Sequence, residues 1–141
     1  GSVAETSAAV LQRLTQVNTL GQIDLVQQLL PALVQSTAAG RSPFVVSISG
    51  VIAERPMAGL SAYSASKAAL HAYATASQRE YQKLGIRWLD ARPGHTESGL
   101  ANRAIAGTAP NFGVGMAVEL VIGRIIKAVL DDEKDLPSGS F

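Results

Sequence analysis

Apolar residues recur at intervals of three and four along much of the chain, which is the spacing of one helix face. Two such stretches come first, from about residue 6 to 17 and from 21 to 35, and each is predicted to form a helix. Further helices are expected at about 62–84 and 114–130. Pro31 lies inside the second stretch and predicts a bend or the loss of one hydrogen bond there.

Two short apolar runs between these helices predict strands. Residues 44–49 end at Gly50, and residues 86–92 end at Pro93 and Gly94. The resulting order of helix, helix, strand, helix, strand, helix favours an α/β fold with a parallel sheet. In such folds the helices cover the sheet faces, and the ligand site lies at the carboxyl ends of the strands.

The length of the chain limits it to one sizeable core. With 141 residues, 47% of them hydrophobic and 16% charged, residues 1–141 are expected to form a single domain or part of one. Residues 95–113 have weak periodicity and predict a long loop, of a length at which loops usually carry function. A tail with a short last strand is expected at 135–141.

Charge and residue usage argue against several classes of function. The net charge of +1 offers no basic stripe for phosphates, so we expect no nucleic-acid partner. The chain has no cysteine, and its two histidines, His71 and His95, stand apart, so we expect no metal site. No apolar stretch is long enough to span a bilayer and no signal peptide is recognisable, so we expect no membrane partner and a cytoplasmic location.

Tyr63 and Lys67 stand four residues apart at the start of the third predicted helix, which puts a phenol and an ammonium on one face. A free tyrosine titrates near about pH 10, and a nearby cation lowers that pKa toward the range useful for proton transfer. The same spacing also occurs by chance in many helices, with a packed ring and a solvated lysine. The expected fold favours proton transfer, because Gly50, Pro93-Gly94 and the start of the helix that carries Tyr63 are all expected at the carboxyl end of the sheet, where the ligand site lies.

A series of short motifs adds to this interpretation. In chain order they are Val17-Asn-Thr-Leu-Gly21, Leu29-Leu-Pro31, Val45-Val-Ser-Ile-Ser49, Tyr63-Ser-Ala-Ser-Lys67-Ala-Ala-Leu70, Gly85-Ile-Arg87 and Arg92-Pro-Gly94. This order resembles the carboxyl-terminal two thirds of a short-chain dehydrogenase/reductase. The resemblance implies a partial doubly wound Rossmann-like parallel sheet with flanking helices. It also implies hydride transfer between NAD or NADP and a small alcohol or carbonyl compound, and assembly into a homodimer or homotetramer.

The resemblance assigns roles to three residues at the reacting centre. Tyr63 is implied as the acid or base that exchanges a proton with the substrate oxygen. Lys67 is implied to lower the pKa of Tyr63 and to bind the nicotinamide ribose, and Asn18 to hold a water of the proton relay. Asn18 also lies between two predicted helices, where a helix cap is an equally reasonable role from the residues alone.

Further residues are implied at the cofactor. Pro93, Gly94 and Thr96 are implied to line the nicotinamide, with Ser98 at a place where the family often has threonine. For Thr96 and Ser98 ordinary turn chemistry after Pro-Gly remains an alternative. Residues 95–112 are implied to form the substrate loop.

Two departures from the family pattern stand out. Gly50 occupies the position where the family usually carries a substrate-binding serine, and Ser49 replaces that serine only if the strand end is bulged or shifted. In addition, these residues contain no glycine-rich turn between a strand and a helix to hold the cofactor pyrophosphate. We therefore expect either part of an oxidoreductase that is inactive in isolation, or a non-catalytic relative that acts as an interaction or oligomerisation module.

Overall fold

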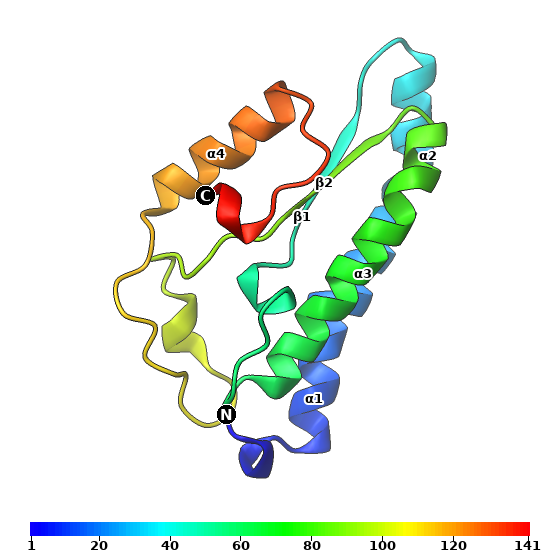
Figure 1. The fold of residues 1–141 in the computed structure, drawn as a ribbon. Coiled ribbons are helices and arrows are strands. Elements are labelled where there is room, and N and C mark those ends of the chain that lie inside the picture. Colours follow the sequence, from blue (N-terminus) through cyan, green and yellow to red (C-terminus); the bar gives the residue numbers. More distant parts are fainter.

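A computed structural model describes residues 1–141 and contains four α-helices and two strands (Figure 1). In chain order these are α1 (Ala8–Thr15), α2 (Gly21–Ala38), β1 (Phe44–Ile48), α3 (Ser61–Lys83), β2 (Arg87–Ala91) and α4 (Val118–Leu130). A π-helical turn, Gln16–Leu20, joins α1 to α2. Four short 3₁₀ helices complete the chain: Val3–Glu5, Val51–Ala53, Leu100–Arg103 and Ser138–Ser140.

The two strands form a parallel sheet, as the alternation of elements predicts. Phe44 pairs with Arg87 at one end and Ile48 with Ala91 at the other. The tail adds only a single bridge between Ala91 and Leu136, so the short last strand expected there is not formed. β1 is less buried than expected of a core strand, because Phe44 and Ile48 are each 50% exposed.

Helices cover the two faces of the sheet in separate layers, with α2 and α3 on one side and α4 on the other (Figure 1). On the first face, Trp88 and Tyr81 form an edge-to-face pair with ring centroids 5.0 Å apart. On the second face, Leu89 and Ala91 pack with Ala128 of α4. Neighbouring residues of β2 thus pack into hydrophobic clusters on opposite faces of the sheet, because successive side chains of a strand point to opposite sides. The α/β expectation is confirmed.

The first two predicted helices form one continuous rod. Ser7 caps its start by accepting a hydrogen bond from the Val10 amide at 3.3 Å. The π turn carries the helix from α1 into α2 without a break, and α2 continues through Pro31 to Ala38. Separate helices were expected because apolar periodicity does not reveal an i→i+5 turn.

No helix of the chain has the length and apolar character needed to cross a membrane.

The carboxyl-terminal third departs from the predicted pattern at its edges. Residues 95–113 form the expected loop, with one 3₁₀ turn at Leu100–Arg103. α4 begins at Val118 rather than 114, because the preceding segment is extended and Met116 pairs with Thr96. This bridge returns the loop to the chain segment that leaves β2.

Candidate active site

The amino end of α3 meets the carboxyl ends of both strands. Lys67, one turn after Tyr63, donates from Nζ to the Ile48 carbonyl at 2.7 Å. Just beyond the end of β2, the Pro93 carbonyl accepts a hydrogen bond from the Val51 amide at 2.8 Å. Segments that are far apart in sequence therefore converge as the order of elements predicts.

Burial dominates the titration of the tyrosine and the lysine. It raises the pKa of Tyr63 above its ordinary value, and it lowers the pKa of Lys67, with the negative charge of Asp90 acting in the opposite direction. Burial thus moves the pKa of Tyr63 in the direction opposite to the effect expected of Lys67. A tyrosine with a raised pKa is protonated near neutral pH, which is the form that donates a proton.

Asn18 lies in the π turn that faces α3. Its amide Nδ2 donates to Ser66 Oγ at 3.0 Å, and Ser66 Oγ in turn donates to the Tyr63 carbonyl at 2.8 Å. Thr19 reinforces the contact by donating from Oγ1 to the Ser66 carbonyl at 2.7 Å. The capping alternative for Asn18 is wrong, because the residue is inside a continuous helix. π turns are often found at functional sites, and this one connects Asn18 to Tyr63 through Ser66.

Ser49 and Gly50 differ from the arrangement that the family pattern requires. Ser49 is fully buried and donates to Asp90 Oδ2 at 2.6 Å, so in this conformation its hydroxyl does not reach a substrate. Gly50 has φ 77° and ψ 164°, a region of backbone space that is essentially restricted to glycine. The strand end therefore offers no hydroxyl at either position.

The residues expected at the nicotinamide follow β2 closely. Pro93 is buried and Gly94 is half-buried. Thr96 Oγ1 donates to the Gly94 carbonyl at 3.0 Å, which is the turn contact considered as its alternative role. Ser98 is exposed, and its amide donates to the Thr96 carbonyl at 2.7 Å.

The loop expected to receive substrate encloses a hollow of its own. His95 and Phe112 both line it, and their rings pack against one another with centroids 5.0 Å apart. Glu97 accepts a hydrogen bond from the Gly115 amide at 2.6 Å and so fixes the base of the loop. Small and polar residues make up most of the lining. Leu100 is 55% exposed and does not line the hollow.

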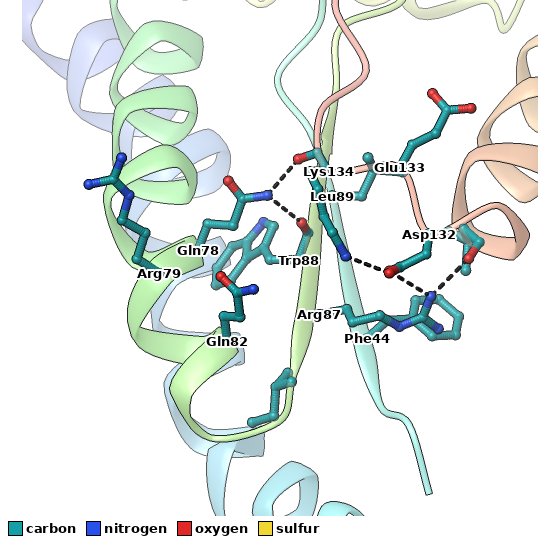
Figure 2. A pocket seen from close by; sticks show the side chains of 12 residues that line it. Phe44, Gln78, Arg79, Gln82, Arg87, Trp88, Leu89, Asp132, Glu133 and Lys134 are labelled. Carbon is teal, nitrogen blue, oxygen red and sulfur yellow. Dashed lines mark hydrogen bonds and ion pairs between the residues drawn. The ribbon is translucent and has the colours of Figure 1, made fainter.

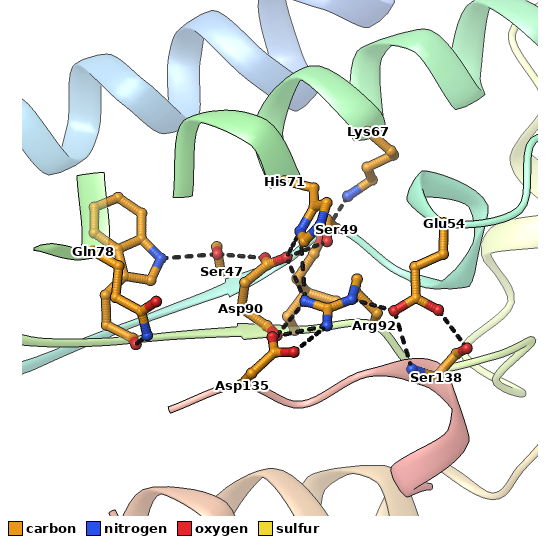
Figure 3. A network of polar contacts seen from close by, with 12 residues as sticks. Ser47, Ser49, Glu54, Lys67, His71, Gln78, Asp90, Arg92, Asp135 and Ser138 are labelled. Carbon is orange, nitrogen blue, oxygen red and sulfur yellow. Dashed lines mark hydrogen bonds and ion pairs between the residues drawn. The ribbon is translucent and has the colours of Figure 1, made fainter. Parts of the chain in front are cut away.

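A buried cluster of charged residues next to these elements was not predicted from the sequence. Asp90 and Arg92, only 6% and 3% exposed, lie at the end of β2 (Figure 3). His71 Nδ1 is 2.7 Å from Asp90 Oδ2, and Arg92 Nη2 donates to Asp135 Oδ1 at 2.7 Å. The available signal was the pair of charged residues on either side of Ala91, at the end of a strand whose middle residues, Trp88 and Leu89, are apolar. No three His, Cys, Asp or Glu side chains form a group able to hold a metal ion.

A second hollow lies at the opposite, amino end of the strands (Figure 2). Arg87 sits over the Phe44 ring at 5.5 Å and donates to the Val129 carbonyl at 2.9 Å. Asp132 lies between two cations, accepting from Arg87 at 3.4 Å and from Lys134 at 2.6 Å. Arg87 and Lys134 thus share one carboxylate, and neither Tyr63 nor Lys67 lines this hollow, so the site at the other end of the sheet is the candidate active site.

Comparison with known proteins agrees with this geometry. A family model described as short chain dehydrogenase matches residues 1–108. The chain belongs to the short-chain dehydrogenase family. Within that family it is 30% identical, over 96% of its length, to a "Dehydrogenase/reductase SDR family protein 7-like" of Anopheles gambiae. It is 26% identical to the "NADPH-dependent 1-acyldihydroxyacetone phosphate reductase" of Saccharomyces cerevisiae over 97% of its length. It spans 44% of the length of each of these two short-chain dehydrogenase relatives.

Solved structures of short-chain dehydrogenases share the fold. One from Streptomyces avermitilis is 32% identical with a TM-score of 0.62, over 83% of this chain and 38% of that one. Another, from Sphingobium yanoikuyae in complex with NADPH, is 25% identical with a TM-score of 0.81, over 98% of this chain and 51% of that one. The Rossmann-like interpretation of the sheet is confirmed, and nicotinamide cofactors are bound by members of the family.

Proposed function

We propose that these residues form the nicotinamide half of the active site of an NAD(P)-dependent reductase that acts on a small carbonyl compound or the corresponding alcohol. The observation that carries the proposal is the hydrogen bond of Lys67, one helical turn after Tyr63, to the Ile48 carbonyl at the carboxyl end of β1, which pairs there with β2. Membership of the short-chain dehydrogenase family supports it.

Tyr63 is the acid in the proposed reduction. The phenol of a tyrosine is protonated at neutral pH, with or without the rise in pKa that burial causes here, so Oη can donate a proton to the substrate oxygen as the carbonyl carbon receives hydride. Lys67, held on the Ile48 carbonyl, supplies the positive charge that stabilises the tyrosinate left behind. Asn18, connected to Tyr63 through Ser66, is proposed to hold the water that returns a proton.

The residues present fit the nicotinamide side of a dinucleotide. Lys67 has three N–H donors and uses one on the Ile48 carbonyl, which leaves two for ribose hydroxyls. Pro93, Gly94 and Thr96, with Ser98 beyond them, follow the strand end where the nicotinamide is expected. When bound, the cofactor supplies or accepts the hydride. We propose that residues outside 1–141 hold its pyrophosphate, and that this chain alone does not bind NAD or NADP measurably.

The test uses the full-length protein that carries these residues. We expect oxidation of NADPH or NADH with at least one member of a carbonyl panel, and a loss of about 10²–10⁴-fold in kcat for Tyr63→Phe with cofactor affinity kept. Tyr73→Phe is the matched control, because Tyr73 loses the same hydroxyl from the same helix but packs on Trp88. Turnover that is unchanged in Tyr63→Phe contradicts the assignment of the acid.

A second candidate function is a non-catalytic interaction or oligomerisation module. Gly50 favours it, because the strand end lacks the substrate-binding hydroxyl of the family pattern. Exposed apolar side chains on the helix rod, such as Leu25 and Leu29 at 53% and 47%, offer a surface for a second copy of the chain. A full-length protein that binds cofactor and self-associates, yet converts no compound of the panel, supports this function over the enzyme.

A further inference from the structure

Asp90 holds the piece of backbone to which Lys67 is anchored. Its carboxylate is 6% exposed and accepts hydrogen bonds from Ser47 Oγ and Ser49 Oγ, both at 2.6 Å (Figure 3). These two serines flank Ile48, whose carbonyl accepts the Lys67 Nζ hydrogen bond. The carboxylate therefore fixes β1 on both sides of the one carbonyl that orients the lysine.

The charges around Asp90 leave its negative charge available to the lysine. Arg92 Nη1 donates to Asp90 Oδ2 at 3.3 Å, but Nη2 forms two bonds to Asp135, at 2.7 and 2.8 Å, and Nε donates to Glu54. Arg92 is thus balanced by two carboxylates of its own, one from the tail and one from the segment after β1.

The face of Asp90 toward α3 carries two basic groups. His71 Nδ1 is 2.7 Å from Oδ2 and acts as the donor, because a carboxylate only accepts. Lys67 is the residue one turn earlier on the same helix face. Burial lowers the pKa of Lys67, and the charge of Asp90 opposes that effect. A half-buried lysine needs such a counter-charge to remain a cation.

We propose that Asp90 is a positioning residue for the reaction, which fixes the Ile48 carbonyl through Ser47 and Ser49 and supplies the negative charge that keeps Lys67 cationic. This inference rests on the proposed function, since it concerns the lysine beside the reacting tyrosine. It also gives a role to a buried carboxylate that the proton transfer itself does not use.

The test compares Asp90→Asn with Asp135→Asn in the full-length protein. Asparagine keeps the size and an acceptor oxygen at position 90 but removes the charge. Two readouts are used: a ¹³C NMR titration of the Lys67 side chain, assigned with Lys67→Arg, and the pH profile of kcat/KM. We expect Asp90→Asn to move the Lys67 titration and the basic limb of the profile to lower pH. Asp135→Asn removes a carboxylate that balances Arg92 but binds neither Ser47 nor Ser49, so it is expected to move the titration and the profile less than Asp90→Asn does.

The outcomes separate this inference from the function itself. A wild-type protein without turnover contradicts the reductase, while the Lys67 titration still decides the role of Asp90. An unshifted titration in folded Asp90→Asn overturns the inference, and a loss of thermal stability alone with no shift assigns Asp90 a merely structural role. If Asp90→Asn does not fold, Asp90→Asn/Arg92→Gln removes both opposite charges. The same shift of Lys67 is expected in it, and its absence overturns the inference.

Discussion

Gly50 shows how one backbone conformation can decide which side chains a site tolerates. Its φ of 77° and ψ of 164° belong to a region that residues with a Cβ rarely adopt. A Cβ added there would lie 3.7 Å from the Pro93 carbonyl oxygen, which is ordinary contact. Space is therefore present, and the backbone alone disfavours a larger residue.

Gly50→Ser is accordingly expected to lower the free energy of unfolding by about 1–3 kcal/mol. The strained backbone, rather than a clash, is the cause, so the new hydroxyl does not raise turnover unless the strand end rearranges. Chemical denaturation measures the change. Gly123→Ser is the control, since Gly123 lies on the exposed side of α4 and an added Cβ meets no atom within 4 Å. Equal stability of Gly50→Ser and the wild type contradicts the prediction.

At the scale of elements, the π turn matters because it connects the long helix rod to α3 by side chains rather than by apolar packing alone. Ser66 is 3% exposed and takes part in two of these contacts, through its hydroxyl to Asn18 and its carbonyl to Thr19, while its hydroxyl also donates to the Tyr63 carbonyl within α3. Asn18 and Thr19 reach it from neighbouring positions of the turn. The relative position of Asn18 and Tyr63 therefore depends on this one residue.

Ser66→Ala is expected to cost about 1–3 kcal/mol in the free energy of unfolding, because Asn18 Nδ2 loses its acceptor in a part-buried place. In the proposed reductase we also expect kcat to fall by about 10- to 100-fold as Asn18 loses its orientation. Unfolding curves and steady-state kinetics measure the two effects. Ser61→Ala, at the exposed first residue of α3, is the control and leaves both unchanged.

The same elements show how far sequence reasoning reaches. α3 and the two strands were predictable because their apolar runs are short, regular and bounded by Gly or Pro, and their order brings Lys67 to the strand ends. The π turn was not predictable, because a single extra residue in a helical turn leaves the spacing of apolar residues nearly unchanged. The hydrogen bond from Ser49 to Asp90 was not predictable either, because 41 residues separate the two partners and no local sequence pattern indicates such a contact.

At the scale of the whole molecule, Glu54 joins the end of β1 to the carboxyl-terminal tail. It accepts hydrogen bonds from the Ser138 amide at 3.3 Å and from the Arg92 side chain. Burial raises the pKa of Glu54, but the bonds from Ser138 and Arg92 outweigh it and hold the pKa below its usual range. A carboxyl group of this kind stabilises the fold when ionised.

The sign of the pH effect follows from that depressed pKa. The contribution of Glu54 is present above the pKa of an unfolded glutamate, about 4.3, and is lost as the pH falls through the lower folded value. We expect Glu54→Gln to reduce the free energy of unfolding at pH 7 by about 1–3 kcal/mol, the range for bonds to charged groups. The difference from the wild type should shrink as the pH falls through the lowered folded pKa of Glu54, because the wild-type carboxyl then becomes protonated as well.

Denaturant unfolding of the protein between neutral and acid pH measures this difference directly. Glu119→Gln is the matched control, because Glu119 lies on the exposed first turn of α4 and its removal leaves the connection between strand and tail intact. A Glu54→Gln variant whose deficit stays constant down to acid pH would show that its carboxylate charge does not secure the tail. If the difference in free energy of unfolding from the wild type disappears at acid pH only for Glu54→Gln, one ionised side chain couples the sheet, Arg92 and the tail. Acid then destabilises these three parts together.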